Sequence, residues 1–269
     1  MEILRDSVAA MVKNKRIWLL QFLLNPALLA LAVGWLLIPE AKAWQVASTG
    51  LLAVVILIVA LWLHATTFAY FGDYHAAGFL RLRASFRPGN TLPFAIWAVL
   101  FVFCLHVVWH AGQSVAEFSV YLESISPAWL RRTMGETGTD KSLTFTFWAL
   151  FWIVVPGLLL PFGVQAARNG FQAFKRAGTR AWRYTIGNRV YWSSLIMLAI
   201  VGAYLPGLLI DWLPKLESMN SESISLVARF TVAWLLAATA WTLIASMLGR
   251  LGNPESSGYL GGKSSTKPT

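Results

Sequence analysis

Six long apolar stretches constrain the fold of this chain more than any other feature of its sequence. The hydrocarbon core of a bilayer is about 30 Å thick, and a helix needs about 20 mostly apolar residues to cross it. Six stretches reach that length: Ile17–Ile38, Val46–Phe71, Leu92–Ala111, Leu143–Val164, Val190–Leu213 and Ile224–Leu248. They are too long for the strands of a membrane barrel, and none shows the alternation of such a strand. The sequence therefore predicts an all-α, polytopic membrane protein with six transmembrane helices.

The composition supports the same class of protein. Of the 269 residues, 57% are hydrophobic and only 13% are charged, whereas a soluble domain carries about 25% charged residues. A disordered chain and an ordinary soluble enzyme are therefore excluded. The single cysteine, Cys104, excludes a disulfide framework and a multi-cysteine zinc site. We expect a membrane domain over residues 1–249 and a disordered cytoplasmic tail, rich in Gly, Ser and Lys, over residues 250–269.

The basic residues predict the orientation of the six spans. Most of the 22 Lys and Arg residues fall in segments on one side of the membrane, and most of the 12 Asp and Glu residues fall on the other. The basic segments are Met1–Arg16, Gly72–Thr91, Gln165–Arg189 and Gly249–Thr269. Because Lys and Arg are enriched in cytoplasmic loops, we expect both termini in the cytoplasm, in a bacterial plasma (inner) membrane. The net charge of +10 then indicates attraction to lipid rather than to nucleic acid.

A short pattern recurs before each odd-numbered span. A basic, half-apolar stretch leads to Asn14, to Asn90 and to Asn188, and each asparagine stands four residues before an aromatic residue. The unit is interpreted as an interfacial helix, an asparagine turn and a hairpin of two spans. The sequence thus predicts three helix-hairpin repeats with cytoplasmic interfacial helices.

The third interfacial stretch, Phe171–Tyr184, shows the clearest two-sided pattern. At 100° per residue, Arg176, Arg180 and Arg183 share one face, and the opposite face carries the aromatic residues Phe171, Phe174 and Trp182. Such a helix fits the headgroup layer, where anionic lipids attract the basic face. The alternative is a connector that only follows the positive-inside rule. Nucleic acid is a weaker partner, because this charge lies within one helix of the bilayer.

Small residues and one long loop predict how the spans are connected and packed. Gly112–Ser142 is the only long loop expected outside, and its helical periodicity and Ser126-Pro127 predict two short helices there. Small residues spaced by four predict close contacts between helices; they are Ala199, Ala203 and Gly207 in span five, Ala30 and Gly34 in span one, and Ala233 and Ala237 in span six.

Polar residues inside a membrane are costly, so each is a candidate for function. Gln21 and Asn25 lie in the first span and His64 lies in the second. Asn25 and His64 have similar depths, so we expect them to face each other in an interhelical hydrogen bond. Contact with a substrate is the alternative.

His106 and His110 are separated by one helical turn in span three, so both rings can leave one face of the helix. That spacing suits a shared metal, and one imidazole alone could ligate haem. His64 lies at a different depth and the helix offers no suitable carboxylate, so we expect a local hydrogen-bonding role and no cofactor.

The chain carries none of the motifs expected of a catalytic site. There is no H-E-x-x-H, G-x-S-x-G, phosphate-binding loop or dinucleotide fingerprint in the sequence. Asp73 and His75 lie close together at the end of span two, but two residues make a weak catalytic signal. The sequence gives no support for an enzyme and leaves the question open.

The pattern of basic stretch, asparagine turn and apolar hairpin at Asn14, Asn90 and Asn188 resembles six-span bacterial proteins of largely unknown function. Among them are families similar to the membrane domain attached to some glycerophosphodiester phosphodiesterases. The resemblance implies the six-span layout, and no phosphodiesterase activity is carried over because that domain is not in this sequence. The leading hypothesis is a non-enzymatic scaffold, assembly factor or modulator of an envelope process. The alternatives are a transporter or permease subunit for a small or amphiphilic solute, and a haem-binding redox subunit.

Overall fold

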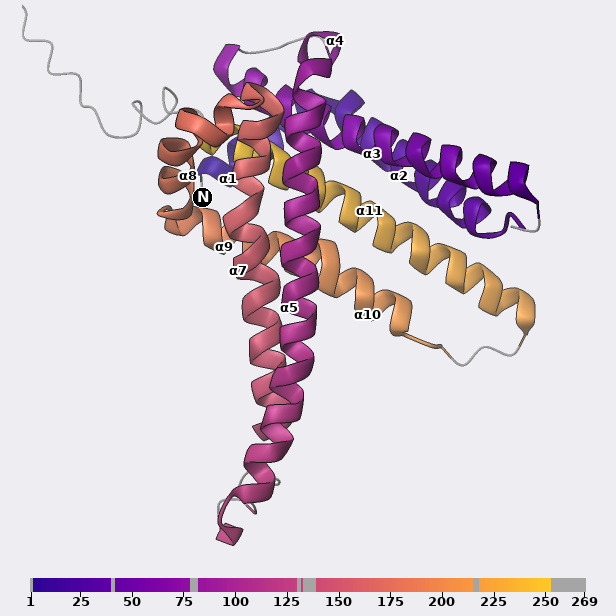
Figure 1. Ribbon diagram of the computed structural model, residues 1–269, viewed down its shortest axis with the longest axis vertical. Coiled ribbons are helices and arrows are strands. Elements are labelled where there is room, and N and C mark those ends of the chain that lie inside the picture. Colours follow the sequence, from indigo (N-terminus) through magenta and orange to yellow (C-terminus); the bar gives the residue numbers. More distant parts are fainter. Residues whose placement is uncertain are drawn as a thin grey trace, which may run out of the picture. The chain divides into compact units, whose positions relative to one another are not determined.

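The computed structural model describes residues 2–39, 42–77, 82–129, 132, 139–214 and 218–252, and all regular elements in these ranges are helices (Figure 1). Six helical segments among them are long and apolar enough to span a membrane: Lys15–Leu36, Ala43–His75, Pro88–Val115, Thr146–Asn169, Arg189–Asp211 and Met219–Leu251. Each overlaps one predicted span. The all-α, polytopic prediction is confirmed, and the chain is an integral, multi-pass membrane protein.

The helices form two compact units, one of residues 1–95 and 161–269 and one of residues 96–160. In the first unit, the long helix α11 (Met219–Leu251) is the central element. It contacts α1 (Glu2–Lys13), α2 (Lys15–Leu36), α3 (Ala43–Ala77), α8 (Gly178–Ile186), α9 (Arg189–Ala199) and α10 (Leu205–Asp211). Half of its apolar window is buried, a larger share than in any other of the six spans.

The repeated layout predicted from the three asparagines is present. Asn14 separates α1 from α2, and Asn188 precedes α9 directly after α8. Asn90 ends a short 3-10 turn, η1 (Pro88–Asn90), between the one-turn helix α4 (Leu82–Ser85) and α5 (Thr91–Ile125). Each odd-numbered span is thus preceded by a short helix and an asparagine.

The second unit is a hairpin made by α5 and the first part of α7 (Thr139–Asn169). The indole of Trp97 donates a 2.9 Å hydrogen bond to the carbonyl of Leu159, and the rings of Trp109 and Trp148 lie 5.2 Å apart. Gly112 lies beneath Trp148, where a Cβ would overlap the indole.

The helix predicted from the periodicity over residues 115–125 is confirmed, but the break expected at Gly112 is wrong. Helix α5 continues without a break to Ile125, and α7 already begins at Thr139. Gly112 was interpreted as the end of a helix, but its missing side chain instead provides room for Trp148. The second short helix predicted after Ser126 falls largely outside the described residues.

A π-helical turn, η3 (Ile200–Tyr204), interrupts span five between α9 and α10. Pro206 follows it, and a proline has no N–H for the carbonyl four residues earlier, which is that of Gly202. The wider turn changes the face that follows, because it adds a residue to the helical register. Within the turn itself, Gly202 faces α11, where a Cβ would lie 2.5 Å from the Cβ of Ala240.

The predicted small-residue contacts are therefore only partly correct. Ala203 is exposed and Gly207 faces open space, so the stripe in span five is wrong because it assumed a regular helix. Gly34 in α2 also has no atom within 4 Å of an ideal Cβ. In α11, Ala233 is buried as expected.

The two remaining predicted segments have different outcomes. The predicted surface helix Phe171–Tyr184 is helical from Ala173, first as a π-helical turn, η2 (Ala173–Ala177), and then as α8. Helix α11 runs to Leu251, slightly beyond the predicted start of the tail. The rest of the tail, from residue 253, lies outside the described residues.

Candidate functional site

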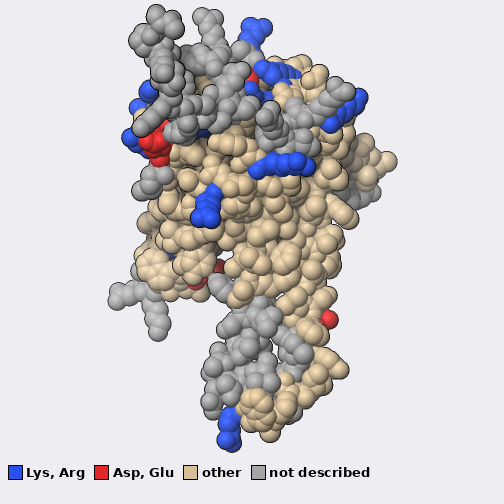
Figure 2. All heavy atoms as spheres, turned by 90° about the vertical axis from the view of Figure 1, so that its left-hand side faces the viewer, with Lys and Arg blue, Asp and Glu red and all other residues tan. Residues whose placement is uncertain are grey.

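Polar contacts concentrate at one end of the first unit, which we call the basic end. It is formed by α1, α4, α8 and the adjoining ends of α3, α7 and α11. In Figure 2 most Lys and Arg side chains visible on this face lie in its upper part, at the level of these short helices in Figure 1. All four basic segments of the sequence have members here.

Asp73, near the end of α3, is the centre of the basic end. Its carboxylate accepts a 2.8 Å hydrogen bond from Arg87 and forms an ion pair at 3.5 Å with Nε of Arg168, at the end of α7. Arg87 also donates a 2.7 Å hydrogen bond to the carbonyl of Arg168. We call these three residues the carboxylate clasp. Gly72 makes it possible, because a Cβ there would overlap the side chain of Arg168.

The first helix, α1, is joined to the end of α11 in a similar way. Asp6 of α1 forms an ion pair with Arg250 near the end of α11. Ser246 donates a 3.3 Å hydrogen bond to the carbonyl of Ser7, and a ring nitrogen of His75 lies 3.3 Å from the Ser246 hydroxyl. Asp73 and His75 therefore have separate partners, and the weak catalytic pair of the sequence is not assembled.

The three asparagines make three different contacts at this end. Asn14 is buried; its side chain donates to the carbonyl of Ala10 at 2.7 Å and accepts a hydrogen bond from the Tyr70 hydroxyl. Asn90 donates to the last carbonyls of α7, those of Ala167 and Arg168, at 2.9 and 2.8 Å. Asn188 caps α9 by accepting a 2.9 Å hydrogen bond from the N–H of Val190. The asparagines thus hold helix ends together.

A second polar group lies inside the spans, between α2 and α3. Gln21 is fully buried and donates a 2.6 Å hydrogen bond to the hydroxyl of Thr67. Asn25 donates to the side-chain oxygen of Gln21 at 2.7 Å. Among the described side chains, the expected hydrogen bond between Asn25 and His64 is not formed. The amide nitrogen of Asn25 donates to Gln21 instead. Thr67 was missed by the sequence analysis.

Tryptophan side chains join α2 to α11. The indole of Trp18 donates to the hydroxyl of Thr239 at 3.0 Å, and that of Trp234 donates to the carbonyl of Phe22 at 3.1 Å. His64 packs edge-on against the ring of Trp241, with 5.3 Å between ring centroids. Nδ1 of His64 and Nε1 of Trp241 are buried without a partner among the described residues.

His106 and His110 lie side by side on an exposed face of α5, with ring centroids 4.3 Å apart. The geometry confirms that both rings leave the same face. Within the described part of the chain, no group of three or more His, Cys, Asp or Glu residues has the arrangement of a metal site. Whether the pair meets a cofactor stays a prediction.

The residues predicted to contact lipid are partly described. Phe171 and Phe174 are exposed, and Phe174 packs edge-on against Phe162 at 5.1 Å. Trp182 is half-buried and Arg183 is exposed. The side chains of Arg176 and Arg180 lie outside the described residues.

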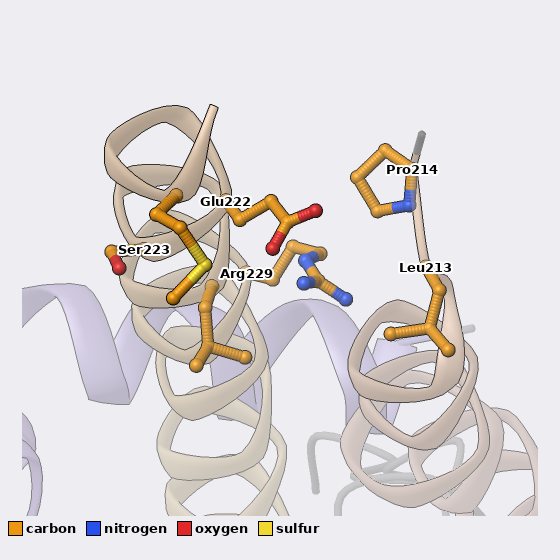
Figure 3. A pocket seen from close by; sticks show the side chains of 7 residues that line it. Leu213, Pro214, Glu222, Ser223 and Arg229 are labelled. Atoms are coloured by element: carbon orange, nitrogen blue, oxygen red, sulfur yellow. The ribbon is translucent and has the colours of Figure 1, made fainter. Parts of the chain in front are cut away.

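At the other end of the first unit, a hollow of about 420 Å³ lies between the end of α10 and the start of α11 (Figure 3). We call it the α10–α11 hollow; its lining is Leu213, Pro214, Met219, Glu222, Ser223, Leu226 and Arg229. Arg229 is 8% exposed. It donates Nε to the carbonyl of Ser225 at 3.3 Å and Nη1 to the carbonyls of Ile210, at 3.1 Å, and Trp212.

Arg229 therefore satisfies carbonyls at the end of α10, where a cation also complements the helix dipole. Glu222 was not predicted as a site residue. Its position seven residues before Arg229 could have indicated it, because residues seven apart lie on one face of a helix.

Comparisons with protein-family models, with curated proteins and with solved structures give no match for this chain. The fold and the composition of its spans define the class: an all-α, multi-pass integral membrane protein.

Proposed function

We propose that this chain is a non-enzymatic scaffold, assembly factor or modulator of an envelope process in the bacterial inner membrane. The observation that carries the proposal is the use of polar side chains within the spans. Gln21 bonds to Thr67 across α2 and α3, and Trp18 bonds to Thr239 across α2 and α11. Intramembrane polar groups elsewhere often form solute pathways. Here they hold helices of the same chain together.

Both termini lie in the cytoplasm under this proposal. Support comes from the contacts at the basic end, where Asp6 pairs with Arg250 and Asp73 pairs with Arg87 and Arg168. These contacts bring segments together that the positive-inside rule assigns to one side. An even number of spans, as in the six-span layout that resembles the membrane domain of some glycerophosphodiester phosphodiesterases, also places both termini on the same side of the membrane.

Reporter fusions test the orientation. Fusions after Lys42, within residues 112–142 and after Lys215 are expected to report an external location. A fusion at Gly178 is expected to report the cytoplasm, and an external signal there would overturn the topology.

Anionic lipid headgroups are the proposed partners of the surface helix at 171–184. The exposed Phe171, Phe174 and Arg183 support this, because an amphipathic helix places aromatic residues in the interface and basic residues at the headgroups. Replacing Arg176, Arg180 and Arg183 with Glu should mislocalise or destabilise the protein. Lys42→Glu on the opposite side is the control, and normal levels and insertion of the triple variant would contradict the proposal.

The scaffold role requires a membrane protein partner or a second copy of the chain. A photoreactive amino acid at Val102 of α5, 64% exposed, or at Leu51 of α3, 68% exposed, samples two apolar faces in native membranes. A discrete protein adduct from one face is the expected result, and an adduct of twice the mass identifies self-assembly. Lipid adducts alone at both positions, together with solute uptake by the purified protein in liposomes, would replace the scaffold by a transporter.

A further inference from the structure

The α10–α11 hollow combines a buried cation (Arg229), a carboxylate (Glu222) and apolar side chains. The hydrogen bonds of the described residues leave part of the guanidinium of Arg229 for a ligand. We propose that the hollow binds the headgroup of an aminophospholipid, with the phosphate on Arg229 and the ammonium group toward Glu222. This proposal does not depend on the scaffold role. The orientation proposed above only decides that the lipid belongs to the outer leaflet.

The guanidinium of Arg229 retains donors for a ligand. Its three hydrogen bonds use Nε and Nη1, and none of the described residues accepts a bond from Nη2. The accepting groups are neutral carbonyls, and no carboxylate in the described part of the chain forms an ion pair with Arg229. The described residues therefore hold the guanidinium in place and provide no ion-pair partner for it. A guanidinium of this kind suits a phosphate, which accepts charge-assisted hydrogen bonds.

Glu222 supplies the second charge at a suitable height. It lies two turns before Arg229 on α11, so the two Cα atoms are about 10 Å apart along the helix axis. Figure 3 shows both side chains extending from α11 into the same hollow, with Leu213 and Pro214 on the opposite side. Glu222 is exposed near the start of the span and Arg229 lies deeper. A lipid headgroup has the same order, with the ammonium group outermost and the phosphate nearer the acyl chains.

The remaining lining fits the apolar part of such a ligand. Leu213, Met219 and Leu226 are all exposed, at 82%, 81% and 44%. Helix α10 ends at Asp211 and α11 begins at Met219, so these side chains lie at the ends of two spans, where acyl chains meet headgroups. A soluble anion would leave this apolar surface uncovered, whereas the first carbons of an acyl chain would cover it.

Lipid retention by the purified full-length protein tests the assignment. Native mass spectrometry would follow titration with phosphatidylethanolamine and with phosphatidylglycerol that carry the same acyl chains. The protein should retain phosphatidylethanolamine more tightly, because only this lipid has an ammonium group for Glu222. Glu222→Gln should weaken its retention by about tenfold, as expected for the loss of one charged hydrogen bond, and should not weaken the retention of phosphatidylglycerol, which has no ammonium group. Glu117→Gln, an exposed carboxylate on α5, is the matched control.

Two further measurements test the proposal without changing Arg229, whose contacts hold the ends of α10 and α11 together. Leu226→Trp should fill the hollow and weaken retention of both lipids while the protein remains folded. Soluble phosphoethanolamine should compete poorly, because it lacks the chains that cover the apolar lining. Equal retention of both lipids by the unmodified protein, or no effect of Glu222→Gln and Leu226→Trp, would overturn the proposal. Competition by phosphoethanolamine at the concentration of the lipid would overturn the lipid and indicate a soluble phosphate compound.

Discussion

Gly249 is the position where the structure makes the sharpest prediction about stability. It is buried near the end of α11, where this helix crosses α3. An ideal Cβ on Gly249 would lie 2.6 Å from the carbonyl carbon of Phe71, 2.7 Å from the nitrogen of Gly72 and 2.8 Å from the oxygen of Phe71. These are backbone atoms and cannot rotate away. Since carbon atoms pack at about 3.5–4.0 Å, Gly249→Ala should force the two helices apart by about 1 Å.

The expected loss follows from this overlap. Overpacking a tight site costs about 1–3 kcal/mol, and replacing a helical glycine with alanine returns about 0.5–1 kcal/mol. The net destabilisation is therefore between about 0 and 2.5 kcal/mol. For a chain of this size, 1 kcal/mol shifts the melting temperature by about 2–4 °C, so Gly249→Ala should lower it by up to about 10 °C.

Gly50→Ala is the matched control, because this glycine lies inside α3 with nothing within 4 Å of an ideal Cβ. It should leave the melting temperature unchanged or raise it slightly. The assay is the loss of the monodisperse peak in size-exclusion chromatography after heating in mild detergent. A melting temperature for Gly249→Ala equal to or above that of Gly50→Ala would refute the close crossing of α3 and α11.

Three other predictions concern polar contacts. Asp73→Asn should destabilise the protein by about 1–3 kcal/mol in the same assay, because the carboxylate clasp loses its only carboxylate. An unchanged melting temperature would show that the clasp does not stabilise the fold. Thr67→Val should cost about 0.6–1.7 kcal/mol, because the amide nitrogen of Gln21 loses its acceptor; an unchanged melting temperature would contradict the pairing. The purified protein should show no haem absorption, and a haem band that disappears on changing His106 or His110 to Ala would show that this prediction is wrong.

The spans could be predicted because hydropathy alone decides which segments cross a bilayer. Their ends were less predictable, because a helix can continue into water. Helix α5 passes Gly112 and reaches Ile125, since a glycine against Trp148 serves packing rather than termination. Sequence alone does not distinguish these two uses of glycine.

The intramembrane pairs show what depth can and cannot predict. Gln21 and Thr67 each lie four residues from the inner ends of the predicted spans one and two, so their depths match, and so do those of Asn25 and His64. Depth therefore allowed both pairs. The rotation of each helix about its axis selected Gln21 with Thr67 and turned His64 toward Trp241, and no local pattern encodes that rotation. In span five, the π-helical turn before Pro206 changed the rotation again.

The carboxylate clasp follows a rule that was available in the sequence but was not applied. A carboxylate on the side of a membrane protein where arginines collect lies among several possible partners, and a partly buried carboxylate needs at least one of them. Asp6 and Asp73 both lie in basic segments, and each pairs with an arginine from another segment, Arg250 and Arg168 respectively. Adjacency along the chain had instead linked Asp73 with His75. Among the described residues, exposed basic side chains such as Lys15 and Arg183 form none of these ion pairs, and under the proposed function they are the ones that meet anionic lipid headgroups.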